Sequence, residues 1–173
     1  MKKALAVLKA GGVIAFPTDT VFGIGALLSK PKAIRKIYKI KKRPLSKPLQ
    51  VLIASFEQAR ELGEFSEKAW QFAKKVWPGP YTLVVYKTRK VPELITGGTN
   101  KVGLRIPAHR TLLKLIRTVG PIVATSANQA GEKPALTTRE VLVKVDYALP
   151  GKVKSGRASK VIDVSRGFKT LRA

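Results

Sequence analysis

The sequence predicts one α/β or α+β domain with a twisted, mixed β-sheet flanked by helices. Two observations lead to this expectation. Short apolar runs with the length of buried strands alternate with stretches whose apolar residues recur at helical spacing. No internal repeat or low-complexity linker divides the 173 residues, and this length suits one domain with a substantial core. We therefore expect residues 1–173 to form a single domain.

The first half of the chain supplies most of the helix signals. Pro31 suits a first helical turn, Ser55 with Gln58 matches a capping box, and Ser66 matches an N-cap. Gly11 and Gly63 are placed to end helices. The expected helices are residues 2–10, 31–43, 56–62 and 66–76, and the expected strands are residues 13–16 and 49–54.

The second half is richer in strand signals. β-Branched and aromatic residues favour strands, and Gly120 is placed as the C-terminal cap of a helix. Thr137 and Glu140 have capping-box spacing, which predicts a helix continuing through residue 145. The expected strands are residues 81–87, 102–106, 122–125, 161–164 and 170–173, and the other expected helix is residues 111–119.

The composition excludes several classes of protein. There are 34 Lys and Arg residues against 10 Asp and Glu, a net charge of +24, which predicts attraction to polyanions such as RNA, nucleotides and phosphates. The absence of cysteine excludes disulfides and thiolate sites, and the single histidine, His109, excludes multi-histidine metal sites. No apolar run is long enough to span a membrane, and the N-terminal apolar stretch is interrupted by Lys9. We expect a cytoplasmic protein.

Three familiar site motifs are absent. The chain has no Walker-type phosphate loop, and the pair Gly23 and Gly25 lacks the third glycine of a dinucleotide fingerprint because position 28 is Leu28. Ser29 and Lys32 have Ser-x-x-Lys spacing, but the partner motifs of penicillin-binding proteins are missing. The chemistry must therefore come from a less common arrangement.

Several expected strands end in polar residues. Thr18, Asp19 and Thr20 follow the strand at 13–16, and ligands often bind at such strand ends, although a plain turn explains these residues equally well. Arg105 interrupts an apolar strand, which is costly unless it meets an anion or faces solvent. The remaining polar groups are Ser126, Asn128, Ser159 and a basic loop with Lys41, Arg43, Ser46 and Lys47. Together they suggest a pocket of hydroxyls, amides and cations for a polyphosphate and a small zwitterion.

Six segments, taken in order, resemble the YrdC/TsaC family of threonylcarbamoyl-AMP synthases, and the resemblance covers essentially the whole chain in its short, single-domain form. The segments are residues 17–25 (PTDTVFGIG), 41–44 with 46–49 (KKRP, SKPL), 77–82 (WPGPYT), 102–107 (VGLRIP), 125–128 with Gly131 (TSAN) and 159–163 (SKVID).

The resemblance implies a YrdC-like sheet around a basic, concave cavity. It also implies a reaction that joins L-threonine, bicarbonate and ATP into threonylcarbamoyl-AMP and pyrophosphate. The product would feed threonylcarbamoyladenosine modification of tRNA through downstream threonylcarbamoyl-transferase proteins. A carbamate is already an anionic nucleophile, so a pocket poor in His, Asp and Glu suits this chemistry, with Mg²⁺ held mainly by the nucleotide.

The family motifs assign roles to particular positions of this chain. The resemblance implies that Lys41 and Arg43 are the catalytic pair that holds the ATP phosphates. The threonine-binding residues would be Thr20, Arg105, Ser126 and Ser159. The ATP-binding residues would be Arg43, Lys47, Lys101, Asn128, Thr137 and Arg172.

Two positions depart from the family pattern, and two other functions stay open. Leu52 stands where some relatives carry a threonine-contacting histidine, and Lys160 follows Ser159 where threonine is usual. The alignment of residues 132–137 is uncertain by one position, and the sequence assigns no role to Asp19.

The charge of +24 also suits a non-catalytic protein that binds double-stranded RNA or tRNA. A carbamoyl-transferase accessory domain is disfavoured by the lack of cysteine and zinc-type motifs.

Overall fold

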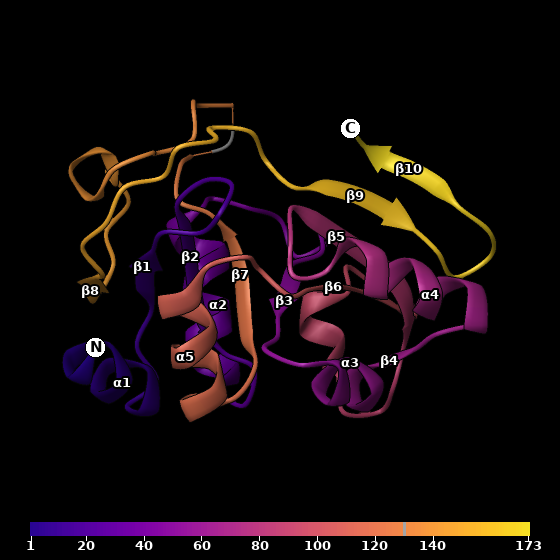
Figure 1. The fold of residues 1–173 in the computed structure, drawn as a ribbon. Helices are drawn as coiled ribbons and strands as arrows, with labels where there is room; N and C mark the ends of the chain where they lie inside the picture. Colours follow the sequence, from indigo (N-terminus) through magenta and orange to yellow (C-terminus); the bar gives the residue numbers. More distant parts are fainter. Residues whose placement is uncertain (130) are drawn as a thin grey trace.

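The computed structural model describes residues 1–129 and 131–173. Within them, five α-helices, two short 3₁₀ turns and ten strands follow one another along the chain (Figure 1). Their bounds are α1 Lys2–Lys9, β1 Ile14–Phe16, β2 Gly23–Leu27, α2 Pro31–Ile40, β3 Gln50–Leu52, α3 Phe56–Leu62, β4 Gly63–Glu64, α4 Glu67–Val76, β5 Tyr81–Lys87, η1 Glu93–Ile95, β6 Lys101–Arg105, α5 Arg110–Val119, β7 Ile122–Ser126, η2 Thr138–Glu140, β8 Tyr147–Ala148, β9 Lys160–Asp163 and β10 Lys169–Arg172.

The strands form one mixed sheet, as the sequence predicts. Its order is β10-β9-β5-β6-β3-β7-β2-β1-β8, and β4 pairs with β5 beside this path. The pairs β3–β6, β5–β9 and β1–β8 are parallel, whereas the other neighbours are antiparallel. The hairpin of β9 and β10, yellow in Figure 1, runs above β5. The sheet therefore brings both ends of the sequence into a single layer.

Helices cover both faces of the sheet. Residues of α2, α3 and α4 pack in one core cluster with Val51 of β3, whereas residues of α1 and α5 pack in a second cluster with Leu52. Neighbouring residues of a strand point to opposite faces, which explains why Val51 and Leu52 separate in this way. The side chain of Gln50 consequently shares its face with Leu52 and with the helices α1 and α5.

Local capping explains where the helices begin and end. The Ser55 hydroxyl accepts a hydrogen bond from the Gln58 amide at 3.3 Å, and the Ser66 hydroxyl accepts one from Ala69 at 3.2 Å. His109 caps α5 by accepting from the Leu112 amide at 3.2 Å, so the single histidine is a helix-start residue. Gly120 follows α5 with φ of +91°, a conformation that favours glycine.

Residues 23–27 lie outside the strands expected from the sequence, but the structure forms a strand there. Gly23–Leu27 form β2, which lies in the middle of the sheet between β1 and β7. A side chain at Gly25 would place its Cβ 2.6 Å from Cγ2 of Ile122, and one at Gly23 would meet the Phe16 ring at 3.0 Å. These glycines are therefore required by close packing, and their presence does not mark a loop.

The predicted helix over residues 141–145 is wrong. Thr137 and Glu140 do interact, at 2.9 Å, but the helical conformation ends with the turn η2 at Glu140. The segment then continues toward β8, and the Asp146 amide donates to the Val13 carbonyl at 2.9 Å. Attachment to the sheet thus overrides the local capping signal. None of the helices in residues 1–129 and 131–173 combines the length and the apolar character that a membrane span needs.

Candidate active site

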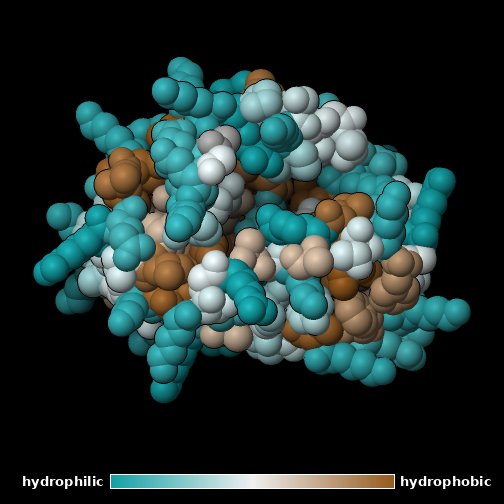
Figure 2. Space-filling view, turned by 90° about the horizontal axis from the view of Figure 1, so that it is seen from above, coloured by the Kyte–Doolittle hydropathy of each residue, from teal (hydrophilic) through white to brown (hydrophobic). Residues whose placement is uncertain are grey.

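A cavity of about 590 Å³ opens on the sheet face that carries α1 and α5. Alternate residues of five strands line it, as expected for one face of a sheet. Figure 2 shows the molecule from above, with hydrophilic side chains around a recess near its centre. The alternating strand residues of the lining are Gln50, Leu52, Thr82, Val84, Lys101, Gly103, Arg105, Ala124, Ser126, Val161 and Asp163. Phe16 of β1, Gly23 of β2, Thr125 of β7, and Leu171 and Arg172 of β10 also line the cavity.

Most of the residues singled out in the sequence meet at this cavity. Its lining includes Thr20, Arg43, Lys101, Arg105, Ser126, Asn128, Ser159 and Arg172. Lys41, Lys47 and Thr137 are not among the lining residues. Lys47 is exposed, and the hydroxyl of Thr137 donates to Glu140 at 2.9 Å.

Arg105 is the most buried cation of the site, with 2% of its surface exposed. Its three guanidinium nitrogens donate to three partners: Nε to the Gly79 carbonyl at 3.0 Å, Nη1 to the Thr20 hydroxyl at 2.9 Å, and Nη2 to Asp19 at 2.6 Å. Burial acts to lower the pKa of Arg105 and the Asp19 carboxylate opposes this effect, so the guanidinium keeps its charge. Asp19, to which the sequence assigns no role, is thus the counter-ion of Arg105.

Arg172, on the hairpin of β9 and β10, forms a second network of hydrogen bonds at the cavity. Arg172 of β10 donates from Nε to the Ser159 carbonyl at 2.9 Å and from Nη2 to the Ser159 hydroxyl at 3.0 Å. The Ser159 hydroxyl lies 2.9 Å from the Thr82 hydroxyl, which donates to Oε1 of Gln50 at 2.7 Å. This chain of contacts connects β10, β5 and β3 across the cavity wall.

The cavity carries more positive than negative charge. Lys101 pairs with Asp163 at 2.7 Å, and the two side chains are 30% and 17% exposed. Burial acts to raise the pKa of Asp163, but hydrogen bonds from Lys101 and Ser165 hold it below its usual value. Arg43 and Arg172 remain as cations to which the structure assigns no carboxylate partner within its described residues. A ligand with several negative charges would complement them.

Lys41 lies behind the cavity wall. Its side chain is 4% exposed, and its ammonium group donates to the carbonyls of Ser126 and Asn128. Burial and, to a smaller extent, the charge of Arg43 lower the pKa of Lys41 to about 8, with Glu132 acting in the opposite direction. Lys41 therefore joins the end of α2 to the loop after β7, which carries two of the predicted site residues.

Arg43 is held differently from its neighbour Lys41. Its side chain lines the cavity while Nη2 donates to the Pro48 carbonyl at 2.8 Å and Nε donates to the Lys47 carbonyl at 3.3 Å. Burial lowers the pKa of Arg43, with the Tyr38 hydroxyl acting in the opposite direction. The loop backbone thus positions Arg43, whereas the Lys47 side chain points outward.

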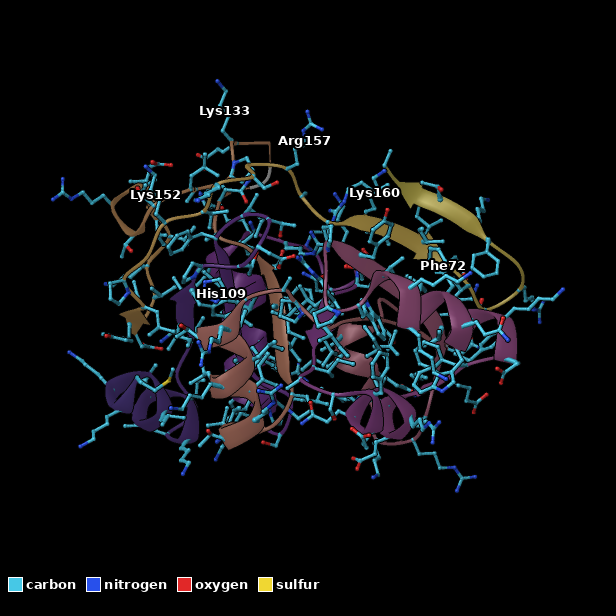
Figure 3. The ribbon with its side chains drawn as sticks, viewed as in Figure 1. Phe72, His109, Lys133, Lys152, Arg157 and Lys160 are labelled. Atoms are coloured by element: carbon cyan, nitrogen blue, oxygen red, sulfur yellow. The ribbon has the colours of Figure 1, made fainter. Side chains whose placement is uncertain are left out.

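Sequence reasoning assigned no role to six polar residues of the cavity lining. They are Gln50, Thr82, Thr99, Thr125, Glu132 and Asp163. For Gln50, Thr82 and Asp163, the detectable signal was alternation, because each shares a strand face with another lining residue two positions away. Lys133 and Arg157, labelled in Figure 3, project away from the loops above the sheet and are not lining residues.

The fold is that of an α/β protein, and the chemistry of its cavity suits a small anionic or zwitterionic ligand beside a polyanion. Its buried arginine and hydroxyls suit a carboxylate or an amino acid, and its less engaged cations suit phosphates. Comparison with known proteins identifies the family. A family model named Sua5/YciO/YrdC and described as "Telomere recombination" matches residues 6–173, and the chain belongs to this family.

Curated relatives support the same assignment. A threonylcarbamoyl-AMP synthase of Pyrococcus abyssi is 41% identical over 170 residues, which are 94% of this chain and 50% of the relative. A protein of the same name from Chromobacterium violaceum is 36% identical over 96% of this chain and 89% of its own length. A third, from Bacillus subtilis, is 39% identical over 89% of this chain and 45% of the relative. The chain thus spans about half the length of two of these relatives.

Solved structures confirm the fold. The crystal structure of P. abyssi Sua5 complexed with L-threonine has a TM-score of 0.94 and 39% sequence identity, covering 99% of this chain and 53% of that protein. The structure of E. coli YciO has a TM-score of 0.90 at 22% identity, covering 98% of this chain and 86% of that one, and supports the fold alone. The predicted mixed sheet with flanking helices is therefore confirmed.

Proposed function

We propose that this protein is an L-threonylcarbamoyladenylate synthase, a nucleotidyltransferase that makes threonylcarbamoyl-AMP and pyrophosphate from L-threonine, bicarbonate and ATP. The observation that carries the proposal is the convergence of Thr20, Arg105, Ser126 and Ser159 with Arg43, Lys101, Asn128 and Arg172 on one cavity. The names of the curated relatives favour this enzyme over the RNA-binding alternative.

The amino-acid half of the site would be built around Arg105. Its guanidinium has five N–H groups, of which three are directed at protein acceptors, so N–H groups remain for a substrate carboxylate. Thr20 and Ser159 are buried hydroxyls beside the two arginines. The threonine complex of the Sua5 relative supports an amino-acid site in this fold.

The nucleotide half would use the less engaged cations. Arg43 comes from the loop after α2, Lys101 from β6 and Arg172 from β10, so three segments would converge on the phosphates. Asn128 lies on the same wall, where its amide donates to the Glu132 carbonyl at 2.6 Å. Lys41 would support catalysis by holding the loop of Ser126 and Asn128. Lys47 and Thr137 would need to move to reach a nucleotide in the cavity.

The reaction follows from positioning and charge. The threonine amine and bicarbonate give a carbamate and water, and a carbamate oxygen then attacks the α-phosphorus of ATP while pyrophosphate leaves. Arg105 would hold the amino-acid carboxylate, and Arg43 with Arg172 would offset the charge that develops on the phosphates. Because the carbamate is anionic, attack requires no strong general base at the cavity.

A metal ion would accompany the nucleotide. The described residues contain no group of three His, Asp or Glu side chains that could hold a metal ion. Of the carboxylates at the site, Asp19 and Asp163 are engaged by Arg105 and Lys101, and Glu132 accepts from the Gln129 amide at 3.0 Å. These contacts support Mg²⁺ bound mainly by the phosphates of ATP, where it would supply further positive charge to the leaving group.

The wider role follows from the product. Threonylcarbamoyl-AMP is an activated acyl donor, so we propose that threonylcarbamoyl-transferase proteins pass its acyl group to adenosine in tRNA, in the cytoplasm. Contact of tRNA with this chain is not required for adenylate synthesis itself.

Pyrophosphate release tests the proposal directly. Purified protein with ATP and Mg²⁺ should release pyrophosphate only when both L-threonine and bicarbonate are present. Arg105→Ala should raise the KM for threonine far more than the KM for ATP, because it removes the partner of the carboxylate. Release that does not depend on threonine or on bicarbonate would reject the assignment, and equal effects on both KM values would remove Arg105 from the carboxylate.

A further inference from the structure

The hydroxyl groups of Thr20 and Ser159 each belong to a chain of hydrogen bonds, called a relay below, and the two relays contain the same kinds of groups in the same order. In the first relay, Arg105 donates to Thr20 at 2.9 Å, Thr20 lies 2.9 Å from the Thr18 hydroxyl, and Thr18 donates to the Val21 carbonyl at 2.7 Å. An arginine, two hydroxyls and a carbonyl therefore follow one another.

The second relay repeats this order with different residues. Arg172 donates to Ser159 at 3.0 Å, Ser159 lies 2.9 Å from Thr82, and Thr82 donates to the side-chain carbonyl of Gln50 at 2.7 Å. Ser159 and Thr82 are 2% and 3% exposed. Such burial leaves little room for water to replace a partner within the relay.

The donor at one end, Arg172, and the acceptor at the other, Oε1 of Gln50, fix the direction of the second relay. A hydroxyl has one hydrogen and two lone pairs, whereas arginine only donates. Because Thr82 gives its hydrogen to Gln50, it must accept the hydrogen of Ser159. The Ser159 oxygen already accepts from Arg172, so one lone pair and no hydrogen remain for a ligand. In the first relay the amides of Thr20 and Val21 also donate to the Thr18 oxygen, so the direction of the Thr20 hydroxyl is not fixed in this way. The Thr20 oxygen accepts from Arg105 and keeps one lone pair for a ligand.

The two relays differ at their final acceptor. The first ends on a backbone carbonyl, which no substitution removes, and the second ends on the side chain of Gln50. Gln50 lines the cavity from β3 and shares its strand face with the apolar Leu52. Whether the Ser159 hydroxyl donates to a ligand or accepts from it thus depends on one replaceable side chain, that of Gln50.

We propose that Gln50 is a positioning residue that makes Ser159 a hydrogen-bond acceptor for the amino group of the substrate. This inference rests on the proposed function. A carboxylate offers no hydrogen, and a side-chain hydroxyl offers only one. An amino group carries enough hydrogens to donate to the free lone pairs of Thr20 and Ser159 together, so it is the group of threonine that matches these two oxygens.

Removal of the Gln50 acceptor should change the Ser159 hydroxyl from a hydrogen-bond acceptor to a donor toward the ligand. In Gln50→Leu, the Thr82 hydrogen is free to turn toward Ser159, whose two lone pairs are then occupied by Thr82 and Arg172. The amino group loses its acceptor. In Gln50→Glu, a carboxylate oxygen still accepts from Thr82, so the direction of the relay is retained.

The test compares two ligands that differ only in the amino group. L-Threonine and (R)-3-hydroxybutyrate, which is threonine without that group, are titrated calorimetrically, the weaker ligand by competition. The ratio of their affinities reports the amino group alone. Gln50→Leu should lower this ratio about tenfold, the equivalent of one hydrogen bond. Gln50→Glu should not lower it, because the acceptor for Thr82 is kept and the added negative charge favours the amino group that only threonine carries.

Controls separate the possible failures. Gln71→Leu, on α4 and outside the cavity lining, should leave the ratio unchanged. If Gln50→Leu does not fold, Gln50→Met, which keeps the length of the side chain but removes its amide oxygen, must lower the ratio equally. An unchanged ratio in a folded relay variant, or an equal loss in Gln50→Glu, overturns the inference. Failure of the proposed function would show separately, as wild-type protein that releases no pyrophosphate with threonine and bicarbonate.

Discussion

Arg105 and Asp19 form the most buried ion pair among the described residues, at 2.6 Å with side chains 2% and 13% exposed. Removal of one member leaves the other charged, buried and unpaired. We expect Arg105→Ala to lower the free energy of unfolding by about 3–5 kcal/mol. The double variant Asp19→Ala, Arg105→Ala should lose clearly less than the sum of the single variants. Urea denaturation of all four proteins measures this coupling.

An exposed pair on the same protein provides the control. Lys90 and Glu61 lie 3.2 Å apart with side chains 64% and 58% exposed. Lys90→Ala should change the stability by less than about 1 kcal/mol, since exposed ion pairs contribute little. Additive losses at Arg105 and Asp19 would show that their interaction contributes nothing to stability.

Lys41 makes stability depend on pH because burial lowers its pKa to about 8, below the ordinary lysine value of 10.5. Between these values the unfolded chain binds the proton more tightly than the native protein does. The free energy of unfolding therefore rises with pH between about 8 and 10.5. Below pH 8 the buried Lys41 is fully charged and its penalty is complete, and loss of the proton relieves this penalty as the pH rises. Lys41→Met should abolish this rise, which is of the order of 2 kcal/mol.

The comparison must be made as a difference between wild type and Lys41→Met. Tyrosines and other lysines also titrate between pH 8 and 10.5, and they contribute to both proteins. Denaturation at pH 7, 8, 9 and 10 then shows the wild type gaining stability relative to the variant. A constant difference over this range would mean that the Lys41 ammonium is not destabilised by burial.

Among the structural elements, β10 lies at the edge of the sheet and pairs with β9 alone, although it contributes to the proposed site. All four residues of β10 are exposed, yet Leu171 and Arg172 line the cavity. The turn is anchored by Phe168, whose ring meets that of Phe72, labelled in Figure 3, edge-to-face at 5.2 Å. Phe168→Ser should raise the KM for ATP two- to tenfold, because an aromatic pair is worth about 0.5–1.5 kcal/mol.

Hydrogen exchange checks the cause of this effect. Amides of β10 should exchange faster in Phe168→Ser, while those of β7, in the middle of the sheet, stay unchanged. Phe56→Ser is unsuitable as a control because Phe56 contacts Trp70 and Trp77 in the core. A fall in the stability of the whole protein, with equal acceleration in β7, would contradict a local role for Phe168.

The elements also show how far sequence patterns determine this fold. Periodicity and capping residues located α1 to α5 and most strands, because those signals are local. They failed at β2, where glycine is required by the packing of Phe16 and Ile122, and at residues 141–145, where attachment to the sheet prevents a helix. Both errors arise from contacts between residues far apart in the chain.

The site was predictable in its members but not in its connections. The motif resemblance named eight residues that the structure brings to the cavity. The pairing of Arg105 with Asp19, 86 positions apart, and the contact between Ser159 and Thr82, 77 positions apart, depend on strand order and register. No local pattern encodes those distances, so Asp19, Gln50 and Thr82 received roles only from the structure.

At the scale of the whole molecule, the dominant property is the net charge of +24. The described residues form four ion pairs, so most of the cations have no carboxylate partner. Mutual repulsion among them opposes the compact state, and dissolved salt screens this repulsion. We expect Tm to rise by several degrees when NaCl increases from about 20 to about 200 mM, near the range over which the Debye length falls below 10 Å.

Scanning calorimetry in chloride and in sulfate distinguishes screening from binding. Screening depends on ionic strength, so the two salts should agree once their ionic strengths are matched. Sulfate bound among the cavity cations would add a saturable increase in Tm, since a ligand stabilises the native state to which it binds. Arg43→Ala, which removes one cation of the cavity lining, should remove that extra increase and leave the screening response intact. A Tm that falls with added NaCl would show that attractive ion pairs outweigh repulsion, despite the charge.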